Sequence, residues 1–97
     1  MAPLTESAAT TTMPGPMITG IQIRAARALL GWSAAKLAET AGVSYPTVQR
    51  AESVDGIPNM RTGSLAALQA TLQIAGIEFL DGSYTGTGGP GVRLRKP

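Results

Sequence analysis

The chain has 97 residues, with eight Lys or Arg against six Asp or Glu, and it contains neither His nor Cys. Their absence excludes disulfides, Cys or His nucleophiles, imidazole bases and the usual zinc ligand sets. The length fits one small domain with tails, and no run approaches the roughly 20 apolar residues of a membrane-spanning helix. We therefore expect a cytoplasmic protein that is not an enzyme, that needs no cofactor or metal and that makes no membrane contact.

The first 16 residues differ in composition from the rest of the chain. They combine Thr, Ser, Ala and Pro with a single charge and no periodic apolar residues, so burial cannot offset the entropy lost on ordering. We expect a disordered tail over 1–16. Met17 follows directly, which leaves Met1 and Met17 as alternative translation starts. From Met17 onward eight basic residues face five acidic ones, an excess that permits an anionic partner without proving one.

A first helix is predicted over 19–30. Thr19 and Gln22 have the spacing of a capping box, in which each side chain accepts a hydrogen bond from the backbone N–H of the other residue. Gly31 suits the left-handed backbone conformation that ends many helices. The start and the end of this helix are therefore both marked in the sequence.

Two short helices joined by a tight turn follow in the stretch SAAKLAETAGVSYPTVQRAE. They are predicted over 33–40 and 44–53, with Ser33 and Ser44 as N-caps. Gly42 suits the end of the first helix. Two short helices that meet through a Gly-containing turn form the helix-turn-helix unit, whose second helix enters the DNA major groove.

The last part of the chain predicts a fourth helix and a β hairpin. The helix starts at Thr62 or Ser64 and ends at Gly76. Residues 77–80 and 92–95 alternate as short strands on either side of a Gly-rich loop. Because two strands alone are marginal in water, this ribbon should pack on the helices, pair with a second chain, or both.

The pattern IRAARALLGWSAAKLAETAGVSYPTVQRAE, followed by LAALQATLQIAG, resembles the lambda-repressor-like, Cro/C1-type helix-turn-helix family (the XRE family) over residues 18–75. The resemblance implies a mainly α fold, a lambda-repressor-like bundle of four short helices with a C-terminal two-stranded β hairpin. It implies a DNA-binding domain over 17–76 and a ribbon over 77–97 for dimerisation or packing. GIEFLDG and GPGVRLRKP are similar to the short β element of some small bacterial regulators.

The family's function implies a sequence-specific bacterial transcriptional regulator that binds a palindromic operator in double-stranded DNA as a homodimer. Four outward positions of the third helix are expected to contact bases: Tyr45, Pro46, Gln49 and Arg50. Phosphate contacts are expected from Gln22, Ser33, Lys36, Ser44, Thr47 and Arg61. Ala34 stands where the family often has a phosphate-binding Gln, and Gln22, Arg24, Lys36 and Arg61 could compensate. Arg27 and Glu52 match a structural ion pair of the family.

Several of these residues have a second interpretation. Tyr45 could instead cover the end of the fold, and Arg50 could be a solvated surface side chain. Trp32 matches an apolar core position of the family rather than a stacking platform. The loop GTGGPG lacks the Lys-Ser/Thr of a phosphate-binding loop. The basic residues from Arg93 to Lys96 either flank DNA or give a strand a charged face that opposes aggregation.

The alternating apolar residues of the ribbon are expected at a dimer interface, where strands of two chains would extend one sheet: Ile77, Phe79, Val92 and Leu94. Operators are commonly two half-sites that a symmetric dimer reads. The alternative function is an antitoxin-like or adaptor module that holds a protein partner through the ribbon, with weak or no DNA binding. The low charge and Ala34 favour that alternative.

Overall fold

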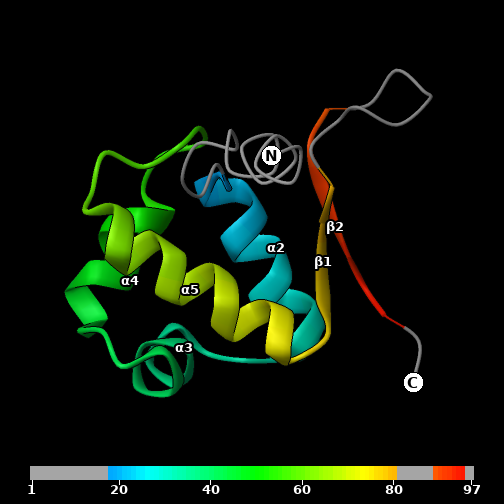
Figure 1. The fold of residues 1–97 in the computed structure, drawn as a ribbon, viewed down its shortest axis with the longest axis horizontal. Coiled ribbons are helices and arrows are strands. Elements are labelled where there is room, and N and C mark those ends of the chain that lie inside the picture. Colours follow the sequence, from blue (N-terminus) through cyan, green and yellow to red (C-terminus); the bar gives the residue numbers. More distant parts are fainter. Residues whose placement is uncertain (1–17, 81–88, 96–97) are drawn as a thin grey trace, which may run out of the picture.

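The computed structural model describes residues 18–80 and 89–95. The described residues form four helices and one hairpin (Figure 1), in the order α2 (Gly20–Leu30), α3 (Ala34–Ala41), α4 (Tyr45–Glu52), α5 (Thr62–Ile74), β1 (Ile77–Leu80) and β2 (Gly91–Leu94). The predicted mainly α fold with a C-terminal hairpin is therefore confirmed. The predictions for the tail 1–16, the start at Met17, the loop over 81–88 and Lys96 fall outside the described residues.

The ends of the first three helices follow the local signals in the sequence. The Thr19 hydroxyl accepts the N–H of Gln22 at 3.1 Å, and the Gln22 side-chain oxygen accepts the N–H of Thr19 at 2.9 Å. The Ser33 and Ser44 hydroxyls cap α3 and α4 in the same way. Gly31 ends α2 with φ 69°. The capping box and the Ser caps are thus confirmed.

The start of α5 differs from the prediction. The helix begins at Thr62, but its N-cap is Arg61, and no side chain accepts a hydrogen bond at that cap. Neither Thr62 nor Ser64 therefore acts as the expected N-cap. The C-terminal end of α5 is Ile74, and Ala75 separates it from Gly76. Gly76 adopts φ 112° just before β1 begins.

The core draws on every helix and on β1. Its largest fully buried side chains are Ile23, Leu37, Val48, Leu68, Leu72 and Ile77. Each such side chain contributes about 1.5 to 3 kcal/mol through the removal of apolar area from water. Trp32 is half-buried and packs against this cluster, as expected for a core position.

Gly20 allows α2 to approach the segment after α4 closely. Its N–H donates to the Gly56 carbonyl at 2.9 Å. A Cβ at Gly20 would lie 2.0 Å from the Val54 carbonyl oxygen and 2.6 Å from that of Ala51. Only a residue without a side chain fits between these two backbone segments.

The hairpin packs against the helices of its own chain. The strands are antiparallel, and Ile77 faces Leu94 while Phe79 faces Val92. Ile77 is 1% exposed, and Phe79 and Val92 pack partly against the core. The prediction that these side chains form a dimer interface is therefore wrong for Ile77, because the apolar face of the ribbon covers its own helices. β2 also starts and ends one residue earlier than predicted.

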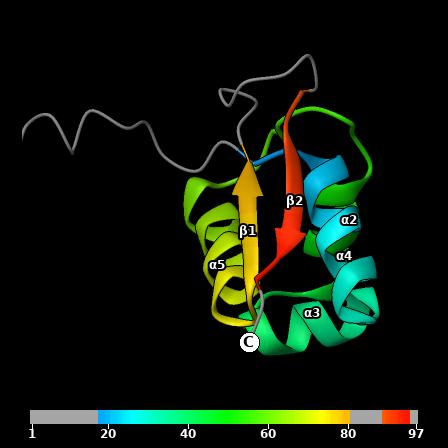
Figure 2. The same cartoon turned by 90° about the vertical axis from the view of Figure 1, so that its right-hand side faces the viewer.

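The hairpin and α4 lie on opposite sides of the molecule. In Figure 1 the strands are seen nearly edge-on at one end of the long axis, and α4 lies toward the other end. Figure 2 shows the strands face-on, in front of α5 and α2. β1 packs on α5 and β2 packs on α2.

Candidate nucleic-acid interface

Backbone hydrogen bonds fix the short turn between α3 and α4. Gly42 has φ 75°, in the left-handed region that favours glycine, and its N–H donates to the Ala38 carbonyl at 3.0 Å. The N–H of Val43 donates to the same carbonyl at 3.0 Å. This is a common C-terminal helix stop. It sets the angle at which α4 leaves α3.

α4 has one buried side and one exposed side. Val48 and Ala51 are fully buried on one side. The other side carries all four residues that are expected to contact bases, and all four are exposed: Tyr45, Pro46, Gln49 and Arg50. We call these four residues the exposed side of α4. Tyr45 is 47% exposed, so it does not serve as a buried cover for the end of the fold.

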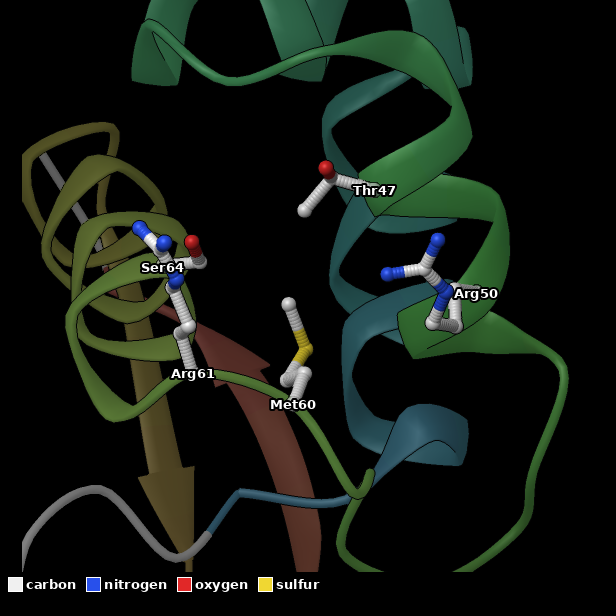
Figure 3. Close-up of a pocket in the computed structure, with 5 residues that line it drawn as sticks. All are labelled: Thr47, Arg50, Met60, Arg61 and Ser64. Atoms are coloured by element: carbon white, nitrogen blue, oxygen red, sulfur yellow. The ribbon is translucent and has the colours of Figure 1, made fainter.

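A hollow lies between α4 and the start of α5 (Figure 3). It has a volume of about 220 Å³ and is lined by Thr47, Arg50, Met60, Arg61 and Ser64. Figure 3 shows the two guanidinium groups on opposite sides of it, with Arg50 reaching from α4 and Arg61 from the start of α5. No carboxylate is among the lining residues.

The arginines at this hollow differ from three of the other four described arginines. Neither Arg50 nor Arg61 has an ion pair within the described part of the chain, whereas Arg24, Arg27 and Arg93 each pair with a carboxylate. The first turn of α5 also carries no acidic residue, and its N–H groups favour an anion. Two guanidinium groups beside such a helix end suit the oxygens of a phosphate.

The other polar candidates lie at the N-terminal ends of α3 and α4. The Ser33 hydroxyl accepts the N–H of Lys36 at 3.0 Å, and the Ser44 and Thr47 hydroxyls are 2.7 Å apart. The Lys36 ammonium lies 5.7 Å from the ring centre of Trp32, at a distance typical of a cation–π contact. Ser33, Lys36 and Ser44 are exposed and Thr47 is partly exposed, so a phosphate can approach both helix ends.

Gln22 is not available for a phosphate, and that prediction is wrong. Its side chain is 4% exposed. Its amide nitrogen donates to the carbonyls of Leu80 at 3.0 Å and Gly91 at 2.9 Å, while its oxygen serves the Thr19 cap. Gln22 therefore attaches the hairpin to α2 and cannot compensate for Ala34.

Arg27 and Glu52 hold α4 against α2. Two nitrogen atoms of Arg27 donate to the two carboxylate oxygens of Glu52, at 2.7 and 2.9 Å, and a third contact goes to the Trp32 carbonyl at 2.9 Å. The hydrogen bond to Glu52 raises the pKa of Arg27, while burial lowers it by less. Arg24 adds a bond to the Glu52 carbonyl and an ion pair with Asp55 at 3.1 Å. These contacts fix the direction of α4.

No sequence signal indicates that Met60 and Ser64 belong to this site. In the sequence Ser64 is a candidate helix start, and Met60 lies in the loop before α5. Both reach the hollow because α5 begins beside α4 in space, and neither residue carries a local motif that indicates this. The hollow therefore depends on tertiary packing.

Two further observations concern the kind of site. Within 18–80 and 89–95, no group of three or more Asp or Glu side chains could hold a metal ion. None of the helices in these ranges is long and apolar enough to cross a membrane.

A comparison with protein families supports the interpretation of this surface. A family model described as helix-turn-helix matches residues 23–67. The match runs from the first turn of α2 into α5, and so it includes the turn, the exposed side of α4 and all residues of the hollow. A comparison with curated proteins found no match to the chain.

Proposed function

We propose that this chain is a DNA-binding regulator of the Cro/C1 type, as the helix-turn-helix match over residues 23–67 supports, and that it reads a specific DNA sequence by placing α4 in the major groove. It acts as a homodimer on a palindromic operator. The observation that carries the proposal is the exposed side of α4. Its four side chains are accessible on one side of the helix, while Val48 and Ala51 are buried in the core on the other.

Each residue on the exposed side of α4 has a role that its chemistry suits. The Arg50 guanidinium donates two hydrogen bonds to O6 and N7 of guanine, which is worth about 1 to 3 kcal/mol of discrimination. Gln49 has the amide that suits adenine N6 and N7. Tyr45 and Pro46 offer apolar surface to a thymine methyl group.

The DNA backbone is held at three places around this helix. Arg61 and Ser64 bind one phosphate at the hollow, where the first turn of α5 adds unbonded N–H groups. The N-terminal ends of α3 and α4 hold the others, through Ser33 with Lys36 and through Ser44 with Thr47. Such contacts supply salt-dependent affinity and fix the register on the duplex.

We assign different roles to the two parts of the chain. Residues 17–76 make the DNA contacts. Residues 77–97 supply the contact between protomers, and the strands β1 and β2 within this range pack against the helices. The attachment of the hairpin through Gln22 and Ile77 supports the packing role.

The test is the base preference of Arg50→Ala. An operator is first selected from a pool of random duplexes with the wild-type protein, and binding is then measured by fluorescence anisotropy to that operator and to versions with single base changes. We expect Arg50→Ala to lose preference at one position in each half-site and to keep it elsewhere. Arg93→Ala, tested on a duplex with a single half-site, is the matched control, because it removes the same charge from β2, which lies on the far side of the molecule from α4. Unchanged discrimination by Arg50→Ala would contradict the assignment.

A second candidate function is a protein-interaction module with weak DNA binding. Two phosphate anchors are missing, since Ala34 has no side chain that could bond a phosphate and Gln22 is committed to the hairpin. Titration of mixed duplexes at two salt concentrations separates the two functions. A regulator keeps its specific sites as non-specific binding fades, whereas an interaction module loses all binding together.

A further inference from the structure

Trp32 and Lys36 meet at the N-terminal end of α3, the first just before the cap residue and the second in the first turn. The Lys36 ammonium lies 5.7 Å from the centre of the Trp32 ring, within the roughly 6 Å over which an aromatic face attracts a cation. Ser33 caps the helix between them, and Ala34 and Ala35 follow it. Lys36 is therefore the charged side chain that stands beside this helix end.

The position of the Lys36 ammonium is electrostatically unfavourable without a partner. The N-terminal end of a helix carries a partial positive charge that disfavours a cation. The first turn of α3 has no acidic residue, and no carboxylate within 18–80 and 89–95 forms an ion pair with Lys36. The Trp32 ring supplies the attraction that carboxylates supply to Arg24, Arg27 and Arg93.

Trp32 is itself held firmly in place. Its backbone N–H donates to the Arg27 carbonyl at 3.0 Å, and its carbonyl accepts a hydrogen bond from the Arg27 guanidinium at 2.9 Å. Trp32 is half-buried and packs against the core. The same guanidinium binds Glu52 of α4. One arginine therefore fixes both the ring beside α3 and the direction of α4.

The contact with the ring leaves Lys36 able to bind an anion. An ammonium group has three N–H donors, and the ring lies on one side of it. Lys36 is exposed, so the remaining donors are open to solvent. A carboxylate partner would neutralise the charge, whereas an aromatic ring orients the ammonium and leaves its charge in place.

We propose that Trp32 is a positioning residue, which holds the Lys36 ammonium beside the cap of α3 so that it meets a DNA phosphate already oriented. This deepens the phosphate contact of Lys36 in the proposed function and rests on it. Ordering a flexible side chain opposes binding. Because the ring already restricts Lys36 in the free protein, less freedom is lost when DNA binds.

Fluorinated tryptophan tests this role without changing the shape of the side chain appreciably. Trp32 is the single Trp of the chain, so biosynthetic incorporation changes this ring and no other. Fluorine withdraws electron density from the ring face and weakens its attraction for a cation. We expect operator affinity, measured by anisotropy at one salt concentration, to fall stepwise with the number of fluorine atoms. The total loss should be about two- to fivefold, which corresponds to an exposed cation–π contact.

The matched control is the same series in Lys36→Met, which keeps an unbranched side chain and removes its charge. Without fluorine, this variant should bind all duplexes more weakly, with a slope of log affinity against log salt reduced by about 1. Fluorination should not weaken its binding further, because the cation is gone. A ring that only packs against the core would instead give the same response with and without Lys36.

Either of two results would overturn the proposal: operator affinity does not change with fluorination, or it declines equally in the wild type and in Lys36→Met. Neither result affects the reading of bases by α4, which is tested separately with Arg50→Ala. A wild-type protein that selects no operator from random duplexes would contradict the proposed function, and the positioning role of Trp32 with it.

Discussion

The two basic surfaces of this molecule use their guanidinium groups in different ways. At the hollow, Arg50 and Arg61 have no carboxylate beside them. On the hairpin, Arg93 pairs with Glu78, and Arg95 donates to the Gln73 carbonyl at the end of α5. A cation that is already paired has little to offer an external anion. Whether a guanidinium group already has a partner within the protein, more than the number of basic residues, therefore distinguishes the surface that suits DNA from the surface that stabilises the hairpin.

The largest effect is expected from breaking the ion pair behind α4. Glu52 is 10% exposed and Arg27 23%, so Glu52→Ala leaves a largely buried guanidinium without its partner and should lower the free energy of unfolding by about 3 kcal/mol. Glu78→Ala breaks the exposed pair on the hairpin, with an expected change under about 0.5 kcal/mol. Urea unfolding followed by circular dichroism checks both. Equal effects would contradict this ranking.

A smaller loss of stability is expected from Gln22→Ala. The substitution removes the cap contact at Thr19 and leaves the carbonyls of Leu80 and Gly91 without the donor that holds the hairpin on α2. We expect a loss of about 2 kcal/mol. Base preference should not change, because Gln22 is buried away from DNA. Thermal unfolding and operator binding of the same variant measure both properties, and a change in salt dependence would restore Gln22 as a phosphate contact.

The smallest effect concerns a single phosphate. Arg61→Ala should weaken all duplexes alike and should reduce the slope of log affinity against log salt by about 1, since one phosphate contact is lost. On a duplex with a single half-site, Arg93→Ala, which removes the same charge from the hairpin, should leave the slope unchanged. Anisotropy titrations over a series of salt concentrations compare the two variants. Equal slopes for both would remove Arg61 from the interface.

Local signals were enough to predict most of the fold. Caps and stops such as Thr19, Gly31, Ser33 and Ser44 act through hydrogen bonds within a few residues, so the sequence displays them directly. The exposed side of α4 was also predicted, because helical periodicity separates it from the buried Val48.

Contacts between distant residues could not be predicted in this way. The bonds from Gln22 to Leu80 and Gly91 span most of the chain, and nothing near Gln22 indicates them. The alternation along β1 and β2 predicted an apolar face but not that this face covers the chain's own helices. The hollow likewise exists only because α5 begins beside α4, which places Ser64 and Arg50 on opposite sides of it.

Methylation interference tests whether Arg50 reads guanine from the major groove. Methylation of guanine N7 blocks that contact and leaves the Watson–Crick pairing of the base intact. We expect methylation of one guanine in each half-site to prevent binding of the wild type and to have no effect on Arg50→Ala. An identical interference pattern for both proteins, or a wild-type pattern without any guanine N7, would contradict it.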